Sequence, residues 1–472
     1  MPEKNGKNKK ERKLVRQSGD ALLLLLIIIS IFSVIMPPII SWTITTDKLV
    51  RETVTREQAL QIAEAGINYY QWHLAHFPTD YKDGTNTNGP YVHNYIDTDT
   101  QNVLGQYSLV ITPPTNGSTI VTISSTGNTS DNPTLKRTIT AKYGIPSLAV
   151  YSFLSNDVIW IGPSETVNGQ MQSNNGIRFD GVGNAPIGSA KSTYTCTSGQ
   201  GSPCPKTENG VWGSASQTVQ NFWQFPVPAV DFSALTSNLA SLKSSAQSGG
   251  IYLPPSNANG YSLVFNSNGT VSVYKVTSLL SDPTGWDVYN NAHNEDIDYN
   301  NRTLQYTVAI PSNGIIYVED NTWVEGVVNG RVMLAAAKLP YVASTAPNIY
   351  IQNNLTYQAK DGSDVLGLLS QQNIVVTYKA PSNLEIDAAL IAQNGSAEMY
   401  YYPSGAVKNN ISIFGSIMTF GQWTWNWVDG NNNNISGYAT TVDTYDNNLL
   451  YSPPPGFPLS ASGYKQISWI SN

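Results

Sequence analysis

The stretch ALLLLLIIISIFSVIMPPII, residues 21–40, contains no charged side chain. At about 1.5 Å of rise per residue, a helix of this length is about 30 Å long, which matches the hydrocarbon core of a bilayer. Pro37 and Pro38 lie near its end and predict a kink, because proline removes a backbone hydrogen-bond donor. The stretch therefore predicts a membrane-spanning helix.

Seven basic residues precede this apolar stretch, and only Glu3 and Glu11 oppose them. They are Lys4, Lys7, Lys9, Lys10, Arg12, Lys13 and Arg16. Because basic flanks stay on the cytoplasmic side, we expect residues 1–19 to form a basic cytoplasmic leader and the rest of the chain to lie outside, as in a single-pass protein. A cleaved secretory signal is the alternative, but residues 36–42 lack its small-residue cleavage site.

After Trp42 the sequence predicts a continuation of the helix to about Ala75. Leu60, Ala63, Ile67, Tyr70 and Leu74 recur at alternating spacings of three and four, which places them on one face. Pro78 ends the pattern. This face predicts either packing against the chain's own domain or a seam between subunits. Residues 20–75 are thus expected to form one transmembrane and extended helix.

Two parts of this segment carry a family resemblance. The leader runs to Arg16-Gln17-Ser18-Gly19, and the helix contains QALQIAEAG at residues 58–66. Together, residues 12–75 resemble the N-terminal segment of PilX-type minor pilins of type IV pilus systems. The resemblance implies a helix held in a membrane or filament. It also implies that the partners are the lipid bilayer and other pilin-like subunits or the pilus assembly machinery.

The resemblance also implies processing by a prepilin peptidase after Gly19, so that Asp20 becomes the first residue. Asp20 departs from the family, which prefers an apolar or small residue there. Leu24 would be the fifth residue of the processed chain, where major pilins carry a glutamate needed for assembly. These departures favour a minor component, or an anchored relative that never polymerises.

The remaining chain reads as β-structure. Alternating segments within residues 76–145 predict a small β-meander, and residues 146–472 contain short apolar triplets separated by Asn and Gly. Triplets without intervening helices exclude a βαβ fold and predict a β-helix, or solenoid, with a β-sandwich as the alternative. A Pro-, Ser- and Asn-rich insertion is expected around residues 192–311. Several C-terminal stretches resemble large ectodomains of PilX-like proteins, for which the resemblance implies no reaction.

The composition excludes other classes. Charged residues make up only 12% of the chain, against 46 Asn and 87 Ser plus Thr. A coiled coil would be richer in charge, and a nucleic-acid-binding protein would carry a basic excess, whereas the isoelectric point is about 5.2. We therefore expect no nucleic-acid partner.

Cys196 and Cys204 are the two cysteines of the chain. They flank a Gly/Ser/Pro-rich loop, and the outward topology would place them in an oxidising compartment, so we expect a disulfide. No histidine lies near enough in the sequence to complete a zinc site.

Other groups give weaker chemical signals. His73 and His76 are spaced to share one helix face but have no third ligand, so we expect no metal site. Acidic residues cluster in two places, where paired carboxylates would be needed for glycoside hydrolysis: Glu295, Asp296 and Asp298, then Asp361 and Asp364. Asp429, Asn431 and Asn433 match the start of a calcium loop, but its Gly and its final Glu are absent.

These observations predict a membrane-anchored, pilin-like structural or adhesive protein at the cell surface or on a pilus, most plainly a minor component of type IV pilus assembly. Surface polysaccharide is an expected partner of the ectodomain. The alternative is a membrane-anchored carbohydrate-binding or carbohydrate-active β-helix protein. We expect neither enzymatic activity nor a cofactor.

Overall fold

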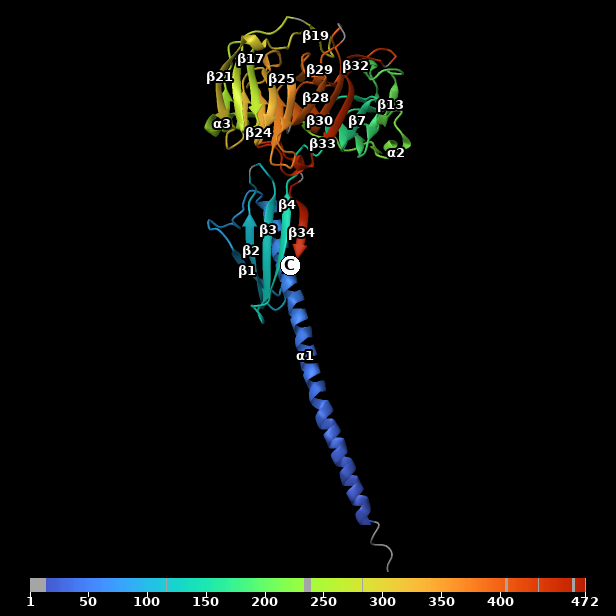
Figure 1. The fold of residues 1–472 in the computed structure, drawn as a ribbon, viewed down its shortest axis with the longest axis vertical. Coiled ribbons are helices and arrows are strands. Elements are labelled where there is room, and N and C mark those ends of the chain that lie inside the picture. Colours follow the sequence, from blue (N-terminus) through green and yellow to red (C-terminus); the bar gives the residue numbers. More distant parts are fainter. Residues whose placement is uncertain are drawn as a thin grey trace, which may run out of the picture. The chain divides into compact units, whose positions relative to one another are not determined.

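A computed structural model describes residues 14–115, 117–232, 239–281, 283–403, 406–431, 433–460 and 463–471, with side chains from Asp20 onward. The chain is mainly β, with one long N-terminal helix (Figure 1). The predictions of a mainly β chain and of a long N-terminal helix are confirmed. The basic side chains of the leader lie outside the described part of the chain. The fold divides into two compact units, of which unit 1 comprises residues 1–111, 123–141 and 468–472, and unit 2 comprises residues 112–122 and 142–467.

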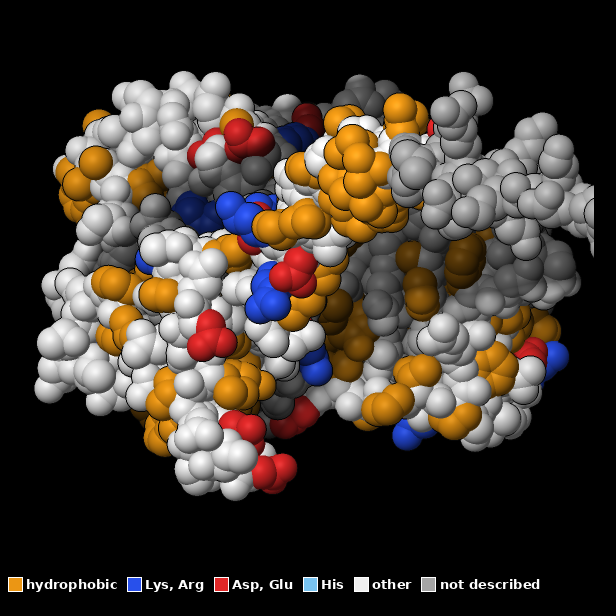
Figure 2. Space-filling model, turned by 90° about the horizontal axis from the view of Figure 1, so that it is seen from below, with side chains coloured by type: hydrophobic (Ala, Val, Ile, Leu, Met, Phe, Trp, Pro, Cys, Tyr) orange, Lys and Arg blue, Asp and Glu red, His pale blue; other side chains and the backbone are white. Residues whose placement is uncertain are grey.

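Helix α1 of unit 1 runs from Leu14 to His76 without a break at Pro37 and Pro38. It is the one described helix that is long and apolar enough to cross a membrane. The large apolar side chains from Leu22 to Ile40 are between 42% and 70% exposed. Figure 2 shows apolar side chains gathered where α1 is seen from its lower end. This half of the helix has no described protein surface to cover it.

The second half of α1 packs on a sheet. The five strands of this sheet have the order β1 (Tyr91–Ile96), β2 (Val103–Thr112), β3 (Val121–Thr129), β4 (Lys136–Gly144) and β34 (Lys465–Ser471). Of the face expected to be apolar, Ala63, Ile67, Tyr70 and Leu74 are at most 1% exposed, and Leu60 is half-buried. The packing interpretation of this face therefore agrees with the structure of unit 1.

Glycines allow the helix and the sheet to approach closely. An added Cβ at Gly127 of β3 would lie 2.3 Å from the carbonyl oxygen of Ala59 and 2.4 Å from the amide nitrogen of Ala63. At Gly66 of α1 it would lie 2.3 Å from the hydroxyl of Ser125. Backbone therefore meets backbone at Gly127, and no side chain fits between them.

Unit 2 is built from parallel strands that pair in three columns. The first column contains, in spatial order, β16 (Ile251–Leu253), β22 (Ile315–Val318), β24 (Arg331–Ala336), β26 (Val365–Ser370), β28 (Asn383–Ala392), β30 (Val407–Thr419), β5 (Phe153–Ser155), β8 (Met171–Ser173), β11 (Ile187–Ser189) and β15 (Trp223–Gln224). Ile316, Leu334, Leu368, Leu390 and Ile417 occupy one register position in successive strands and are fully buried. Apolar stacking thus runs along the column.

The second column contains β17 (Gly260–Asn266), the start of β23 (Thr322–Val328), the start of β25 (Ile349–Tyr357), β27 (Ile374–Val376), β29 (Ala397–Met399) and β31 (Trp423–Thr424). The third contains the ends of β23 and β25, the first parts of β28 and β30, then β33 (Asn434–Tyr445), β7 (Glu165–Asn168) and β10 (Val182–Gly183). From residue 315 to residue 424, the chain visits the first, second and third columns in turn.

The remaining elements of unit 2 extend or flank these columns. They are β6 (Ile159–Ile161), β9 (Ile177–Phe179) and β14 (Val211–Trp212) in one three-stranded sheet; the pairs β12 (Thr193–Thr195) with β13 (Thr207–Asn209) and β19 (Gly285–Trp286) with β20 (Ala292–His293); the antiparallel additions β18 (Thr270–Val276), β21 (Arg302–Ala309) and β32 (Asn426–Val428); and the helices α2 (Gln217–Gln220) and α3 (Leu239–Gly249).

The spatial order of the first column differs from the chain order. Ile417 of β30 pairs with Phe153 of β5, so the strand of this column that comes last in the sequence lies beside the one that comes first. The chain leaves one end of the column after β15 and re-enters at the other end at β16. Phe232 and α3 pack on the buried cluster that includes Leu154 and Tyr317. The segment expected as an insertion, residues 192–311, therefore supplies β15, β16 and β17 to the columns; its Pro- and Ser-rich stretches concealed these short strands.

We expect Gly127→Ala to loosen unit 1, because the new methyl group would meet two backbone atoms of α1. Overpacking of this kind costs roughly 1–3 kcal/mol. Gly249→Ala is the control, since its Cβ would have its nearest neighbour at 3.6 Å. Limited proteolysis of the full chain across a urea series, followed at β1 to β4 by mass spectrometry, measures the change. Equal protection of the two variants would contradict the close packing.

Candidate functional site

The three columns of unit 2 differ in strand pairing at one junction, where the strands of residues 153–168 follow those of residues 407–445. The first column continues from β30 to β5 and the third from β33 to β7. The second does not: no described strand pairs with β31 beyond β29, and β6 starts the separate sheet with β9 and β14. A cavity of about 480 Å³ lies here, lined by Trp423 of β31 and Trp160 of β6 among others. We call it the aromatic groove.

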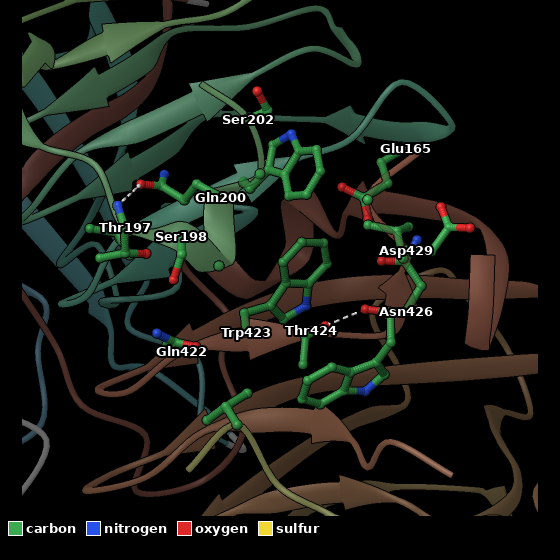
Figure 3. A pocket seen from close by; sticks show the side chains of 18 residues that line it. Glu165, Thr197, Ser198, Gln200, Ser202, Gln422, Trp423, Thr424, Asn426 and Asp429 are labelled. Carbon is green, nitrogen blue, oxygen red and sulfur yellow. Dashed lines mark hydrogen bonds between the residues drawn. The ribbon is translucent and has the colours of Figure 1, made fainter. Parts of the chain in front are cut away.

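Four parts of the chain line the groove. Two of them carry the tryptophans: Trp160 comes from β6, and Trp423 and Trp427 come from β31 and β32. Residues 197–202, between the two cysteines, and Val288 complete the lining. In Figure 3 the indole of Trp423 lies between Thr197 and Gln200 on one side and the acidic side chains of Glu165 and Asp429 on the other.

The three indole N–H groups have different partners. That of Trp160 donates to Asp180 at 2.9 Å, and that of Trp427 donates to the carbonyl of Met399 at 2.8 Å. The N–H of Trp423 finds no acceptor among the described residues, although the atom is buried. Because this atom is itself buried, Trp423 contributes its ring, and not its N–H, to the lining of the groove.

The polar lining consists mainly of amides and hydroxyls, and no Lys, Arg or His is among the described lining residues. Two carboxylates are present. Burial raises the pKa of Glu165 to about 7, and the Oε2 atom accepts from the amide of Gly162 at 2.6 Å. Hydrogen bonds from the Asn433 side chain and from the backbone of Asn433 and Asn431 lower the pKa of Asp429. The groove therefore presents neutral polar groups beside two acids.

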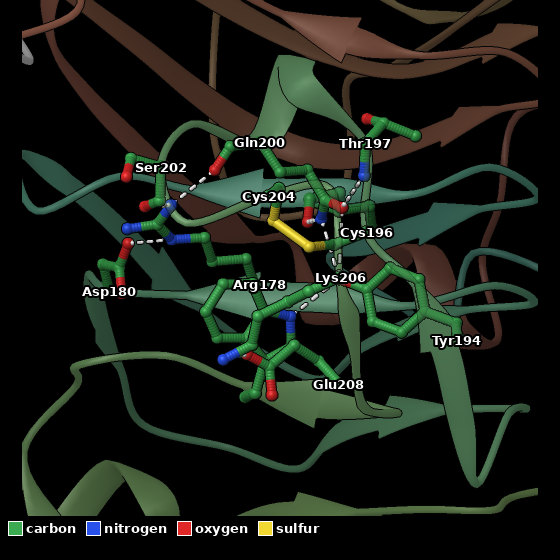
Figure 4. Close-up of a disulfide and its surroundings, with 12 residues drawn as sticks. Arg178, Asp180, Tyr194, Cys196, Thr197, Gln200, Ser202, Cys204, Lys206 and Glu208 are labelled. Carbon is green, nitrogen blue, oxygen red and sulfur yellow. Dashed lines mark hydrogen bonds and ion pairs between the residues drawn. A yellow bond between two sulfur atoms is a disulfide. The ribbon is translucent and has the colours of Figure 1, made fainter.

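The disulfide loop forms one wall of the groove. Cys196 and Cys204 are bonded, as expected (Figure 4). Inside the loop, Gln200 is 2% exposed and donates to the carbonyl of Ile159 at 2.7 Å. From outside it, the Arg178 guanidinium donates to the carbonyls of Gln200 and Ser202 at 2.5 and 2.8 Å and lies over the Trp160 ring at 4.7 Å. The wall and one indole are thus held by the same cation.

The acids singled out in the sequence serve local structure. Glu295 accepts from the hydroxyl of Tyr402 and from the amide of Tyr378, and Asp296 accepts from the amide of Lys379 at 3.1 Å. Asp298 caps a short 3-10 helix by accepting from Asn300. In the second group, Asp361 accepts from Ser363, and Asp364 accepts from the amides of Gly330 and Ala359. None of these five acids lines the aromatic groove.

The metal candidates also have local partners. His73 is 5% exposed and contacts Asp80 at 3.0 Å, whereas His76 contacts the carbonyl of Trp72. Asp429 accepts from the backbone amides of Asn431 and Asn433, which closes its own turn. In the described part of the chain, no group of three or more His, Cys, Asp or Glu residues is placed to hold a metal ion.

Two residues of the proposed cleavage site lie in α1. Gly19 falls in its first turns, where side chains lie outside the described residues, and Asp20 is exposed. Sequence reasoning missed the aromatic groove, because Trp160 and Trp423 are far apart in the chain. The signal that marks one wall is WTWNW at residues 423–427, with three tryptophans in five positions.

We expect Cys196→Ser/Cys204→Ser to loosen residues 197–203. Closing a nine-residue loop contributes about 2.6 kcal/mol in the chain-entropy estimate. Protease cleavage within this loop, mapped by mass spectrometry, should therefore become faster in the double variant while cleavage elsewhere in unit 2 stays unchanged. Cleavage at the wild-type rate would show that the Arg178 and Gln200 contacts alone hold the loop.

We expect the stability of unit 2 to fall as the pH rises from 5 to 8. Burial, with the nearby charge of Asp287, raises the pKa of Glu398 to about 8, above its ordinary value of 4.5. Between these values the folded state holds a proton that the unfolded state has lost, so stability falls by up to about 1.4 kcal/mol per pH unit. Glu398→Gln should flatten this dependence in thermal unfolding at pH 5 and 8.

Glu385→Gln is the control for Glu398→Gln, because the Glu385 side chain is 50% exposed. It should leave the pH dependence of the unfolding temperature as it is in the wild type. The prediction is wrong if Glu398→Gln changes the unfolding temperature equally at both pH values.

No model of a known protein family matches the sequence, and no characterised protein sequence matches it. Among solved structures, the competence-associated pilin ComZ from Thermus thermophilus matches 89% of this chain and 98% of its own, with 13% identity and a TM-score of 0.29. A TM-score this low carries no inference about the present chain. The PilX-type resemblance of residues 12–75 thus has no family model behind it.

Proposed function

We propose that this chain is a membrane-anchored, pilin-like structural or adhesive protein of the cell surface, and a minor component of type IV pilus assembly. Helix α1 carries the proposal. Its first half exposes a continuous apolar surface, while its second half is built into the sheet of unit 1. Covering the exposed half with lipid, or with equivalent helices of other subunits, removes that surface from water.

The PilX-type assignment rests on the sequence resemblance of residues 12–75. The exposure of the first half of α1 agrees with it, because a pilin-like helix must be free to enter a membrane or a filament. The seven basic residues before the apolar run favour a cytoplasmic N-terminus. The chain beyond about Trp42 would then lie outside the cell, where the Cys196–Cys204 disulfide persists.

We further infer that unit 2 is a β-helix. Its three columns are parallel, and the chain visits them in a fixed rotation from residue 315 to residue 424. A sandwich is instead built from antiparallel sheets. Stacked turns bury Ile and Val inside without long helices, which suits a surface module of low charge.

We also propose that the chain has a binding rather than a catalytic role. Each of the five acids singled out in the sequence accepts at least one hydrogen bond from a neighbouring part of the fold. In the aromatic groove, Glu165 is held by Gly162 and Asp429 by its own turn. In this proposal, the groove lies outside the cell and binds the ligand through which the protein adheres.

Leu26→Glu should impair membrane retention, since Leu26 is 60% exposed in the apolar run. A charge at the centre of a spanning helix costs about 2.5–3.5 kcal/mol. Leu49→Glu is the matched control, with a leucine that is 59% exposed on the same helix beyond the run. Carbonate extraction of membranes followed by immunoblotting measures retention of the two variants.

N-terminal sequencing of protein from membrane and sheared-filament fractions tests the pilin-like part. Processed protein is expected to begin at Asp20. Protease added to intact cells should also remove the chain beyond about Trp42 and spare the leader. Equal retention of the Leu26 and Leu49 variants, or protection of unit 2 from protease, would overturn the proposal.

A further inference from the structure

We propose that the aromatic groove binds a short segment of a neutral oligosaccharide. Its place outside the cell rests on the proposed function, whereas the binding itself rests on the groove alone. A volume of about 480 Å³ is within the usual range of roughly 300–1,000 Å³ for small-ligand sites. The groove is an interruption in a rigid stack, so it exists before any ligand arrives.

The indoles supply the apolar part of sugar recognition. A pyranose ring has one face of C–H bonds, which is attracted to the electron-rich face of an aromatic ring, while its hydroxyls point outward. Trp160 and Trp427 are fixed by hydrogen bonds of their N–H groups to Asp180 and Met399. Their rings are therefore held in place and lose little freedom when a ligand binds.

The polar lining supplies the hydrogen-bonding part of sugar recognition. Thr197 and Ser198, which are exposed, bring hydroxyl groups to the groove, and Gln422 brings an amide. A sugar hydroxyl is both an acceptor and a donor. The same ligand can thus exchange hydrogen bonds with these groups and donate to the carboxyl groups of Glu165 and Asp429, which also line the groove.

The charges of the groove decide between ligand classes. Asp429, whose pKa is lowered, lines the groove and no described basic residue does, so a uronate, sialate or phosphate would meet repulsion with no cation in the lining. A proline-rich peptide also packs on tryptophan, but it offers few donors to the two carboxylates. Neutral sugars fit both the indoles and the acids.

The experiment is isothermal titration calorimetry on the full chain in an amine-oxide detergent. Detergents with sugar headgroups are avoided, because they would compete for the groove. The probes are cellohexaose, chitohexaose, maltohexaose and mannohexaose, with hexagalacturonate as the acidic counterpart and a decaproline peptide as the alternative ligand. Saturable binding of at least one neutral hexasaccharide is expected, and neither hexagalacturonate nor decaproline should bind.

Two variants locate the binding. Trp427→Ala should weaken it about tenfold by removing a stacking ring. Trp423→Phe makes a second lining ring smaller, and should weaken binding about fivefold. Trp286→Phe is the control, since Trp286 lies outside the groove lining and should leave affinity unchanged. Unaltered near-UV circular dichroism identifies variants that retain the wild-type fold.

Binding of a neutral hexasaccharide that both groove variants weaken supports the proposal. Absence of binding at millimolar probe, preference for hexagalacturonate or decaproline, or wild-type affinity in folded Trp427→Ala and Trp423→Phe would each overturn it. Because purified protein is used, these results are independent of membrane retention. Failure of the anchor proposal would leave sugar binding intact, and the reverse also holds.

Discussion

The pairing of Ile417 with Phe153 is the constraint on which unit 2 depends. It joins the last strand of the first column along the chain to the first, in parallel and in register, so that one apolar stack runs through both. Without it the ten strands would form two shorter stacks, each with an exposed end. The chain must therefore return along the column between β15 and β16, and Phe232 and α3 cover buried residues on this return.

The same junction creates the aromatic groove. Two of the three columns cross it with continuous hydrogen bonding, and these fix the distance between the two halves. The second column is interrupted, so the facing strands β31 and β6 present side chains instead of backbone partners. Tryptophans occupy both, and the disulfide loop closes one side. The groove is thus a consequence of chain topology, held by the neighbouring columns.

The sequence predicts the parts of this protein that depend on local pattern. The uncharged run of residues 21–40, the spacing of Ala63, Ile67 and Tyr70, and the loop between the cysteines each specify one element, and the structure contains all of them. The junction is not local. Nothing near Phe153 in the sequence indicates Ile417 as its neighbour, so neither the return of the chain nor the groove could be predicted. The strands β15 to β17 were missed because they lie among Pro-, Ser- and Asn-rich stretches, and because β15 and β16 have only two and three residues.

The apolar stack of the third column is also interrupted at this junction. Asp443 of β33 occupies the register position that Ile413 and Val167 occupy in the adjacent strands. It is 2% exposed, and both of its carboxyl oxygens lack partners in the described structure. Burial, with the charge of Glu165, raises the pKa of Asp443 well above its ordinary value. An apolar residue there would continue the stack at lower cost. Asp443 lies near Glu165, which lines the groove. Buried polar groups that destabilise a fold are expected at binding sites. The second column lacks strand pairing at this junction, and the third column lacks an apolar residue there. Both features lie at the groove, which supports the proposal that the groove binds a ligand.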